Sequence, residues 1–427
     1  MQPLRDRPLR VMPDPEPRQR DVGRMAAGRM AASRMQRAVE PEVASRSRRE
    51  FRPTVYKVSL VNMDYTLLIT MSLLVLIGLI MVYSASYYVA ATSARFGNDM
   101  FGPLRSQAVA AIAGLAGMIV MANINYSTHL RKFAVIGYIA AIALLIITVM
   151  FGEEVNGARR WINLSFIRFQ TSEVTKIALA MFIAHCIAAN KKMADTYKGI
   201  AILGVFIGIM VAIVGHRWGT NNMSSAIILV IIGGGIIFVA SEKTWAFIGA
   251  GIAGVVGLTA VLAFGVGFRA NRFAMWFDPF ADPSDAGLQT VQSLFAIGSG
   301  GMFGLGLGQS RQKLGFIPEV HNDVIFSVIS EELGFIGASL VLFLFGVYVW
   351  RAIKIAINAK DMYGCLLATG IALMVAAPAI INIAVVTNTI PNTGVPLPFI
   401  SHGGTSLLVL MAATGVLLNI SRYQTKS

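Results

Sequence analysis

The feature that most constrains this chain is a succession of apolar blocks, each long enough to cross a lipid bilayer. The hydrocarbon core of a bilayer is about 30 Å thick, which a helix of roughly 20 residues spans. Hydrophobic residues make up 55% of the chain and charged residues only 14%, against about 25% charged residues in soluble domains. We therefore predict an all-α integral membrane protein with about ten transmembrane helices. The predicted spans are 65–87, 106–124, 131–151, 171–189, 199–214, 222–240, 245–268, 323–350, 364–389 and 404–420.

Basic residues between the spans predict the orientation of the chain, because Lys and Arg accumulate in short cytoplasmic loops. With the N-terminus inside, most of these residues fall on the inner side, and the C-terminus is then inside as well. The prediction is therefore N-in and C-in. The basic residues on the predicted inner side are Arg131, Lys132, Lys191, Lys192, Lys198, Lys243, Arg351, Lys354, Lys360, Arg422 and Lys426.

Several arginines fall on the predicted outer side, against the usual bias. The forked guanidinium suits bidentate binding of phosphate or carboxylate, which would give these residues a task. The alternative, still open at this point, is that they bind lipid headgroups or cap loop carbonyls. The outer basic residues are Arg159, Arg160, Arg168, Arg217, Arg269, Arg272, Arg311 and Lys313.

Residues 1–58 differ in composition from the rest of the chain. They contain fourteen Lys and Arg against seven Asp and Glu, a net charge of +7, and they lack a sustained apolar period. We predict a basic, largely disordered cytoplasmic segment beside a membrane domain at 59–427, and no nucleic-acid partner. Because the segment lacks the apolar core of a cleavable signal peptide, the first span is expected to act as an uncleaved signal.

One outer loop, at about 269–322 between the seventh and eighth spans, is much longer than the others. Long loops in compact proteins tend to be functional or disordered. The apolar stretches FAMWFDPFADP and LQTVQSLFAIG argue against disorder. We predict a folded cap on the outer surface.

Asp323 opens the eighth predicted span and is the first candidate for chemistry. At 100° per residue, Asp323, Ser327, Ser330 and Gly334 share one face of a helix, which predicts a polar stripe pointing into the bundle. Glu331 lies at the edge of this stripe, about 12 Å along the helix, where a charge needs a partner. Asp323 is either an N-terminal helix cap or a carboxylate base at the membrane surface.

A second group lies around the start of the fourth span, in NGARRWINLSFIRFQTSEVTK. Glu173 and Lys176 are one turn apart on the predicted helix, so an i,i+3 ion pair is the structural alternative. Ionisable residues inside a membrane segment more often mark a path or a site. Arg159, Arg160 and Lys176 together could hold an anionic headgroup such as a pyrophosphate.

A third group, PNTGVPLPFISHGGTS, precedes the last span. Its prolines and glycines predict an irregular backbone at membrane depth, which is tolerated where it is buried or lines a cavity. It is either a rigid turn or a wall of the substrate site, and His402 is expected to be a hydrogen-bonded loop residue. Cys186 and Cys365 lie inside apolar blocks without metal-ligand spacing, so neither a disulfide nor a zinc site is expected. The chain also lacks a Walker loop, HExxH and a nucleophile elbow.

In these groups the chain resembles the SEDS family (shape, elongation, division and sporulation), the bacterial cell-wall glycosyltransferases that include RodA, FtsW and SpoVE. The resemblance extends from about Asp64 to Arg422. The form GLGLGQSRQK resembles the division and sporulation branch more than RodA. The motifs that carry the resemblance are MDYTLL, MVYSAS, NGARRWI, QTSEVTK, FDPFADP, QTVQSLFAIGSGG, GLGLGQSRQK, PEVHNDVIFSVISEELGF and VPLPFISHGGTSLL. The chain departs from the family pattern at Thr171, Val324, His402 and GHRWGTNNMSSA.

The resemblance implies polymerisation of lipid II, the undecaprenyl-pyrophosphate-linked disaccharide-pentapeptide, at the outer face of the bacterial cytoplasmic membrane during division or sporulation. It implies that Asp323 is the essential catalytic carboxylate and that a class B penicillin-binding protein and other division proteins are partners. No metal ligand set can be read, although a divalent cation (Mg or Mn) could assist. The residues that it places in substrate binding are Arg159, Arg160, Trp161, Glu173, Lys176, Gln309, Lys313, His321 and Ser401.

The mechanism that we expect is inverting transfer, with Asp323 as the base for the attacking sugar hydroxyl and the cations on the departing pyrophosphate. Two other classes of function remain open. A lipid II flippase predicts charges near the bilayer midplane and internal repeats, and no convincing repeat relates the halves of the chain. A non-catalytic division scaffold explains the basic segment but leaves Asp323 and the outer arginines without a task.

Overall fold

The computed structural model describes residues 63–92, 99–155, 158–163, 168–216, 219–243, 245, 249, 275–282, 287–313 and 320–423. All of them belong to the second of the two units into which the chain divides, Val58–Ser427. The predictions for residues 1–58, for the span 245–268 and for Arg217, Arg269 and Arg272 lie outside the described residues.

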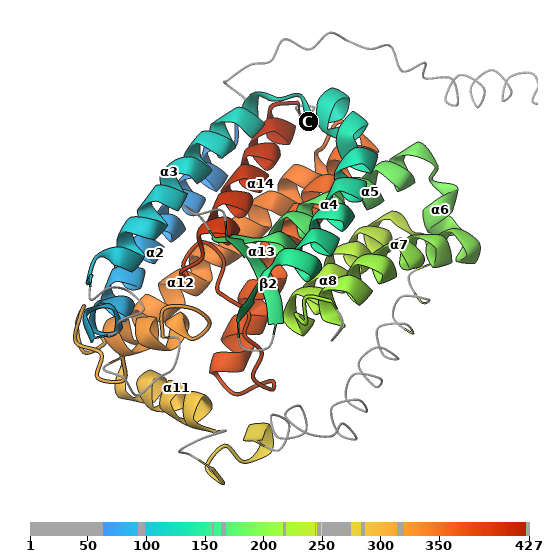
Figure 1. Cartoon of the computed structure of the whole chain (residues 1–427). Coiled ribbons are helices and arrows are strands. Elements are labelled where there is room, and N and C mark those ends of the chain that lie inside the picture. The colour runs from blue at the N-terminus through green and yellow to red at the C-terminus, as the bar shows by residue number, and fades with distance from the viewer. Residues whose placement is uncertain are drawn as a thin grey trace, which may run out of the picture. The chain divides into compact units, whose positions relative to one another are not determined.

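In the described part of the chain, nine helices are long and apolar enough to cross a membrane (Figure 1). Each matches one predicted span, so the prediction of an all-α membrane protein is confirmed. The spanning helices are α2 (Tyr65–Thr92), α3 (Gly102–Asn123), α4 (Arg131–Phe151, preceded by the π-helical turn η3, Tyr126–Leu130), α5 (Thr171–Ala189), α7 (Tyr197–Gly215), α8 (Met223–Ala240), α12 (Ile325–Ile357), α13 (Met362–Val386) and α14 (Gly404–Arg422). The shorter helices are α6 (Lys192–Asp195) and α11 (Leu288–Ser299).

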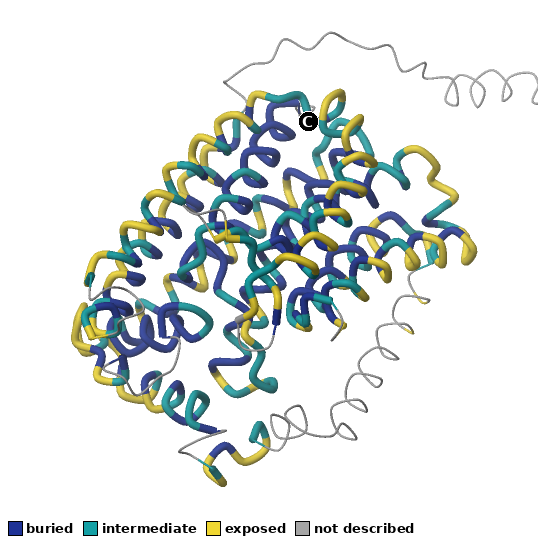
Figure 2. The backbone as a smooth tube through the Cα atoms, viewed as in Figure 1, coloured by how far each residue is buried: buried dark blue, intermediate teal, exposed yellow. Residues whose placement is uncertain are grey.

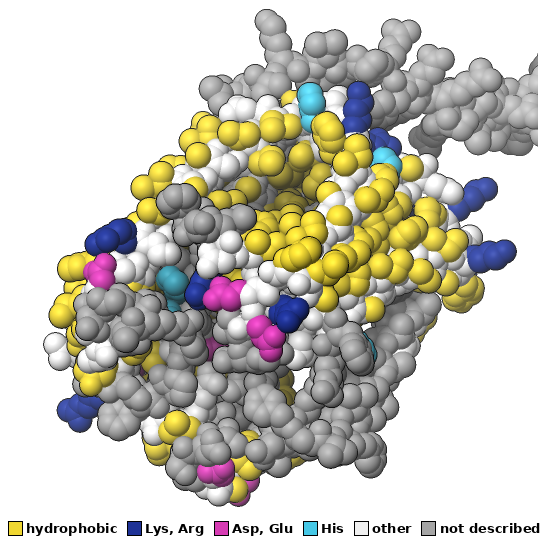
Figure 3. All heavy atoms as spheres, in the orientation of Figure 1, with side chains coloured by type: hydrophobic (Ala, Val, Ile, Leu, Met, Phe, Trp, Pro, Cys, Tyr) yellow, Lys and Arg dark blue, Asp and Glu magenta, His cyan; other side chains and the backbone are white. Residues whose placement is uncertain are grey.

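The bundle has its most buried helices in the middle. Buried positions dominate α13 and α14, whereas α2, α3 and α4 carry exposed positions along their outer sides (Figure 2). Many of these exposed side chains are large and apolar, such as Ile112 on α3 and Ile136 on α4, which are 70% and 61% exposed. Hydrophobic side chains cover much of the face formed by α3, α4 and α7 (Figure 3). A surface of this kind is favourable only against lipid.

The first and last described helices meet at one end of the bundle. The backbone N–H of Asp64, just before α2, donates to Ser421 near the end of α14 at 3.2 Å. The Arg351 guanidinium, in the second half of α12, donates to the Asp64 carboxylate at 2.7 and 2.9 Å. Asp323 lies just before the opposite end of α12. The start of α2 and the end of α14 are therefore at the end of the bundle away from Asp323, and which side is cytoplasmic stays a prediction.

A small antiparallel sheet, which we did not predict from the sequence, joins α4 to α5. It consists of β1 (Glu153–Val155), β2 (Ala158–Asn163) and β3 (Arg168–Gln170) in the order β1-β2-β3. Trp161 of β2 faces Gln170 of β3, and Gln170 is also the N-cap residue of α5. The sheet therefore fixes where the arginines of β2 lie relative to the start of α5.

The helix α12 differs from its prediction in two ways. It begins at Ile325 with Val324 as the N-cap, and Gly334 interrupts it with φ +67° and ψ −168°. The prediction of a continuous helix over 323–350 was therefore wrong. Glycine suits the break, because it adopts this positive φ more readily than other residues. The hydroxyls of Ser327 and Ser330 donate to the carbonyls of Val324 and Phe326 at 2.6 and 2.9 Å. Both side chains are buried, in agreement with the predicted polar stripe that faces the interior.

The glycine-rich segment 300–308 packs against this break. The amides of Leu305 and Gly306 donate to the carbonyls of Glu331 and Glu332 at 2.9 and 3.0 Å, and the amide of Phe335 donates to Gly301 at 2.9 Å. These bonds satisfy backbone groups that the broken helix leaves open. Glycine is required by space as well, because a Cβ on Gly304 would lie 2.2 Å from the Glu332 carbonyl oxygen.

Candidate active site

Asp323 lies one residue before the N-cap of α12 and is partly buried, so it is not the cap of this helix. Its Oδ1 accepts a hydrogen bond from Gln289 Nε2 of α11 at 3.3 Å. Its backbone carbonyl accepts from Asn382 Nδ2 of α13 at 2.5 Å, and the same amide group donates to the Val395 carbonyl at 2.7 Å. Two helices distant in the chain, α11 and α13, therefore contact the residue, and Asn382 also ties it to the segment of Val395.

Glu173 and Lys176 form the predicted ion pair in the first turns of α5, with Lys176 Nζ at 2.6 Å from Glu173 Oε1. Both side chains are less than a tenth exposed. The hydroxyl of Ser406, in the first turn of α14, donates to the other carboxylate oxygen at 3.1 Å. The carboxylate thus orients the ammonium group and is itself oriented by α14.

The FISHGGTS segment, residues 399–406, connects these two groups. Ser401 Oγ donates to the carbonyl of Asn322 at 2.5 Å, and the His402 amide donates to the carbonyl of His321 at 2.9 Å. Ser406, which binds Glu173, lies five residues after Ser401, a distance of at most roughly 18 Å even in an extended chain. The FISHGGTS segment therefore links Asp323 to the Glu173–Lys176 pair, at the same end of the bundle.

The residues of the ARRWIN strand β2 lie beside this region. The Thr405 hydroxyl of the FISHGGTS segment donates to the Arg168 carbonyl of β3 at 2.9 Å, which ties the sheet to α14. Arg159 is exposed and pairs with Glu154 at 3.4 Å. Arg160 Nη2 donates to the Asn221 carbonyl at 2.6 Å. Each arginine thus makes contacts of the structural kind, from an exposed or partly exposed position.

Some residues around the site were not identified from the sequence. Gln107 of α3 is buried and binds the FISHGGTS segment from both ends of its amide, donating to the Ser401 carbonyl and accepting from the Gly403 amide, each at 3.1 Å. Gln289, Asn382 and Ser406 were missed as well. A polar residue inside an apolar span is the only sequence signal for Gln107.

The comparison with protein families shows to which family the chain belongs. A family model for cell cycle proteins, FtsW, RodA and SpoVE, matches residues 64–426. This chain belongs to the FtsW/RodA/SpoVE family.

Two relatives of this FtsW/RodA/SpoVE protein illustrate the similarity. Stage V sporulation protein E of Bacillus subtilis (strain 168) is 39% identical over 365 residues, which are 84% of this chain and 97% of the relative. A probable peptidoglycan glycosyltransferase FtsW of Geobacter sp. (strain M18) is 37% identical over 365 residues, 84% of this chain and 96% of the relative.

Solved structures share the fold of this family member. A structure of a peptidoglycan synthase complex that coordinates polymerization and crosslinking aligns with a TM-score of 0.70 at 24% identity, covering 86% of this chain and 99% of the other. The rod shape determining protein RodA of Thermus thermophilus aligns with a TM-score of 0.60 at 23% identity, covering 86% and 98%. At these identities the likeness concerns the fold.

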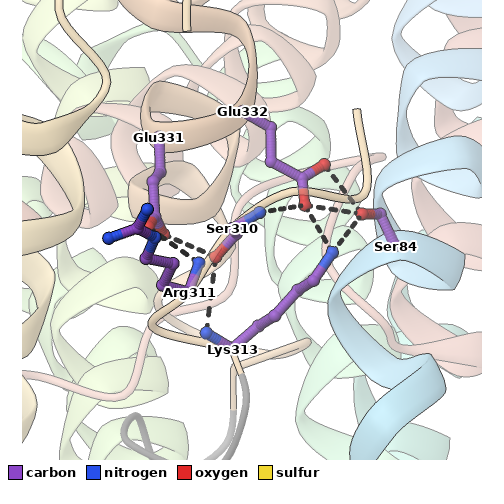
Figure 4. Close-up of polar contacts among 6 residues, drawn as sticks. All are labelled: Ser84, Ser310, Arg311, Lys313, Glu331 and Glu332. Atoms are coloured by element: carbon purple, nitrogen blue, oxygen red, sulfur yellow. Dashed lines mark hydrogen bonds and ion pairs between the residues drawn. The ribbon is translucent and has the colours of Figure 1, made fainter. Parts of the chain in front are cut away.

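Two predicted substrate-binding residues of this FtsW/RodA/SpoVE protein, Gln309 and Lys313, make no described contact with Asp323 or with the Glu173–Lys176 pair. Lys313 is fully buried, and its Nζ is 2.6 Å from Glu332 Oε1 and 3.1 Å from Ser84 Oγ. Gln309 is exposed in the turn just before. Lys313 belongs to a polar cluster between α2, the glycine-rich segment and the break in α12. The cluster comprises Ser84, Ser310, Arg311, Lys313, Glu331 and Glu332 (Figure 4).

Glu331 is fully buried, and its carboxylate has hydrogen-bond partners in this cluster. The Ser310 hydroxyl donates to Oε2 at 2.5 Å, and the Arg311 amide donates to Oε1 at 2.9 Å. The neighbouring carboxylate of Glu332 accepts from the Ser84 hydroxyl at 2.7 Å. Both carboxylates are thus bound inside the protein (Figure 4).

Within the described ranges of this family member, no three His, Cys, Asp or Glu side chains are placed to bind one ion. The amide of Gln289 presents an N–H donor, not a ligand oxygen, to Asp323. We therefore assign no chemical step to a cation.

Proposed function

We propose that this multi-pass protein of the bacterial cytoplasmic membrane is a peptidoglycan glycosyltransferase that polymerises lipid II in division or sporulation. The observation that carries the proposal is the connection of Asp323 to the buried Glu173–Lys176 pair through the FISHGGTS segment. A carboxylate and a cation at one end of a membrane bundle suit a substrate whose sugar lies at the surface and whose diphosphate lies at the lipid boundary. Relatives named as probable peptidoglycan glycosyltransferases support the reaction class.

In this mechanism the Asp323 carboxylate accepts the proton of the 4-hydroxyl of the acceptor sugar. The hydroxyl oxygen forms a bond to C1 of the lipid-linked donor strand while the bond from C1 to the diphosphate oxygen breaks. The electron pair of that bond leaves with the undecaprenyl diphosphate, and the configuration at C1 inverts. The acceptor must therefore lie on the opposite side of C1 from the leaving group.

Lys176 is the cation placed to stabilise the leaving diphosphate, because charge develops there in the transition state. Glu173 holds its ammonium group in one orientation. Arg159 and Arg160, on β2, complete the positive side of the site from exposed and partly exposed positions. Trp161, His321 and Ser401 are the remaining residues proposed to bind the substrate. Ser401 also binds the carbonyl of Asn322, the residue before Asp323.

A purified full-length chain supplied with lipid II tests the proposal, with and without candidate class B penicillin-binding proteins. A general base contributes about 10²–10⁴-fold, so Asp323→Ala and Asp323→Asn are expected to lower the polymerisation rate by that factor. Asp99→Asn is the matched control, because Asp99 lies in another loop and pairs only at the surface with Arg105.

Two outcomes would contradict the proposal. Asp323→Ala that polymerises at the wild-type rate removes the base. Movement of lipid II across proteoliposome membranes without polymerisation would assign the protein to transport. Stimulation by one class B penicillin-binding protein would identify the transpeptidase partner, in keeping with the synthase complex whose fold the chain shares.

A further inference from the structure

We propose that Gln289 is a positioning residue for the Asp323 carboxylate and that Asn392 holds the other end of the Gln289 amide. The inference rests on the proposed role of Asp323 as the base. Gln289 lies in the first turn of α11, within the predicted outer loop, and reaches Asp323 from 34 residues away in the chain.

The support of Gln289 is the first step of the argument. The helix α11 buries Val291, Ser293 and Ala296, and it packs against α12 and α13. The Ser293 hydroxyl donates to the carbonyl of Gln289 at 2.7 Å. Gln289 therefore stands on a packed helix, which is a more rigid support than a loop.

The direction of the amide is the second step. A glutamine side chain has a donor end and an acceptor end, and only its partners tell which end faces where. Asn392 Nδ2 donates to Gln289 Oε1 at 2.9 Å. An ionised carboxylate only accepts, so the donor end, Nε2, faces Asp323 Oδ1, and the acceptor end is left for Asn392. A donor at this place favours the ionised carboxylate, the form that can accept a proton.

The second carboxylate oxygen has a different surrounding. Oδ2 of Asp323 lies beside Gly394, where an added Cβ would come within 3.2 Å of it. The two oxygens of Asp323 therefore have different described neighbours, the Gln289 amide at Oδ1 and the Gly394 backbone beside Oδ2. A side chain at position 394 would crowd the carboxylate, whereas glycine leaves its orientation to Gln289.

Two substitutions of Gln289 separate positioning from a tethering role. Gln289→Glu keeps the shape and the acceptor for Asn392 but removes the donor to Asp323, whereas Gln289→Leu removes both bonds. If Gln289 positions the carboxylate, Gln289→Glu lowers the polymerisation rate at saturating lipid II at least as much as Gln289→Leu. If it only ties α11 to the loop of Asn392, Gln289→Glu is the more active variant.

The expected loss for both variants is about 10- to 100-fold in kcat, in the range that a misplaced catalytic group produces, with KM for lipid II changed far less. Gln292→Leu, on the same helix, is the matched control and is expected to keep the wild-type rate. Thermal unfolding in detergent checks that each variant is folded. If Gln289→Leu is not folded, Gln289→Met is used in its place.

The failure of this inference differs from the failure of the proposed function. If Asp323→Ala is inactive while Gln289→Glu and Gln289→Leu keep the wild-type kcat, only the role of Gln289 is overturned. If Asp323→Ala is active, the proposed base itself is lost. In the Asp323→Ala background, Gln289→Leu is expected to cause no further loss, and a further tenfold loss would contradict an action through Asp323.

Discussion

The buried pair of Lys313 and Glu332 gives the sharpest prediction for stability. Both side chains are 0% exposed, and their charged atoms are 2.6 Å apart. At this distance the attraction is about 6 kcal/mol with an effective dielectric constant of about 20. Removing water from the two ions costs several kcal/mol each, so the pair contributes little net stability. Removing one partner is different, because it leaves a buried charge alone.

Lys313→Met is therefore expected to destabilise the protein by about 3–5 kcal/mol. The Ser84 hydroxyl still donates to the Glu332 carboxylate in this variant, but no cation remains beside it. The measurement is thermal unfolding of the full-length chain in detergent, where a loss of this size lowers the midpoint by roughly 5–15 °C. Lys191→Met is the matched control, because the Lys191–Glu242 pair is exposed and should leave the midpoint unchanged.

The double variant Lys313→Met/Glu332→Gln tests the reasoning. It removes the unpaired charge and keeps an acceptor for Ser84 and the Ser310 amide, so most of the lost stability should return. A double variant as unstable as Lys313→Met would refute the argument that the lone carboxylate causes the loss. A stable double variant that polymerises lipid II normally would also remove Lys313 from substrate binding, and a stable but inactive one would support that prediction.

Two further predictions concern the proposed active site. The double variant Lys176→Met/Glu173→Gln leaves no lone buried charge, so it should fold. It should lower the polymerisation rate by about 10²-fold, because the leaving diphosphate loses its cation. A wild-type rate in the lipid II assay would contradict this role of Lys176. Gly394→Ala brings a Cβ within 3.2 Å of Asp323 Oδ2 and should lower kcat by about tenfold, whereas Gly137→Ala, where nothing lies within 4 Å, should not. Unchanged kcat in Gly394→Ala would show that Oδ2 does not need this space.

The spans were predictable where hydropathy and local capping agree. The helix α5 begins at Thr171 and ends at Ala189, as the sequence predicted, because polar residues delimit its apolar block on both sides. The break at Gly334 was not predictable, since its cause is a partner segment some 30 residues earlier in the chain, and an isolated glycine in a helical pattern is common. The sheet was not predicted, because strands as short as the three residues of β1 and β3 show no reliable alternation of apolar and polar residues.

The candidate site shows the same division between local and distant information. Asp323, Glu173 and Lys176 were predicted because each belongs to a local pattern, a charge at a helix start or one turn apart within an apolar block. Gln289 and Gln107 were not, because their roles come from contacts 34 and 294 residues away in the chain. An amide side chain has no charge to make it conspicuous in a span or an amphipathic helix, and its direction depends on its partners.

The break at Gly334 has a further consequence for Asp323. The backbone hydrogen bonds that would continue α12 across this residue are replaced by bonds to the glycine-rich segment, so this segment positions the short stretch of α12 before Gly334. Glu332 lies near the end of this stretch. The Lys313–Glu332 pair at one end and the contacts of Gln289 and Asn382 at the other thus fix a short rigid element. The position of the carboxylate is therefore set by two contact regions of the loop and its neighbours, and less by the continuity of a transmembrane helix.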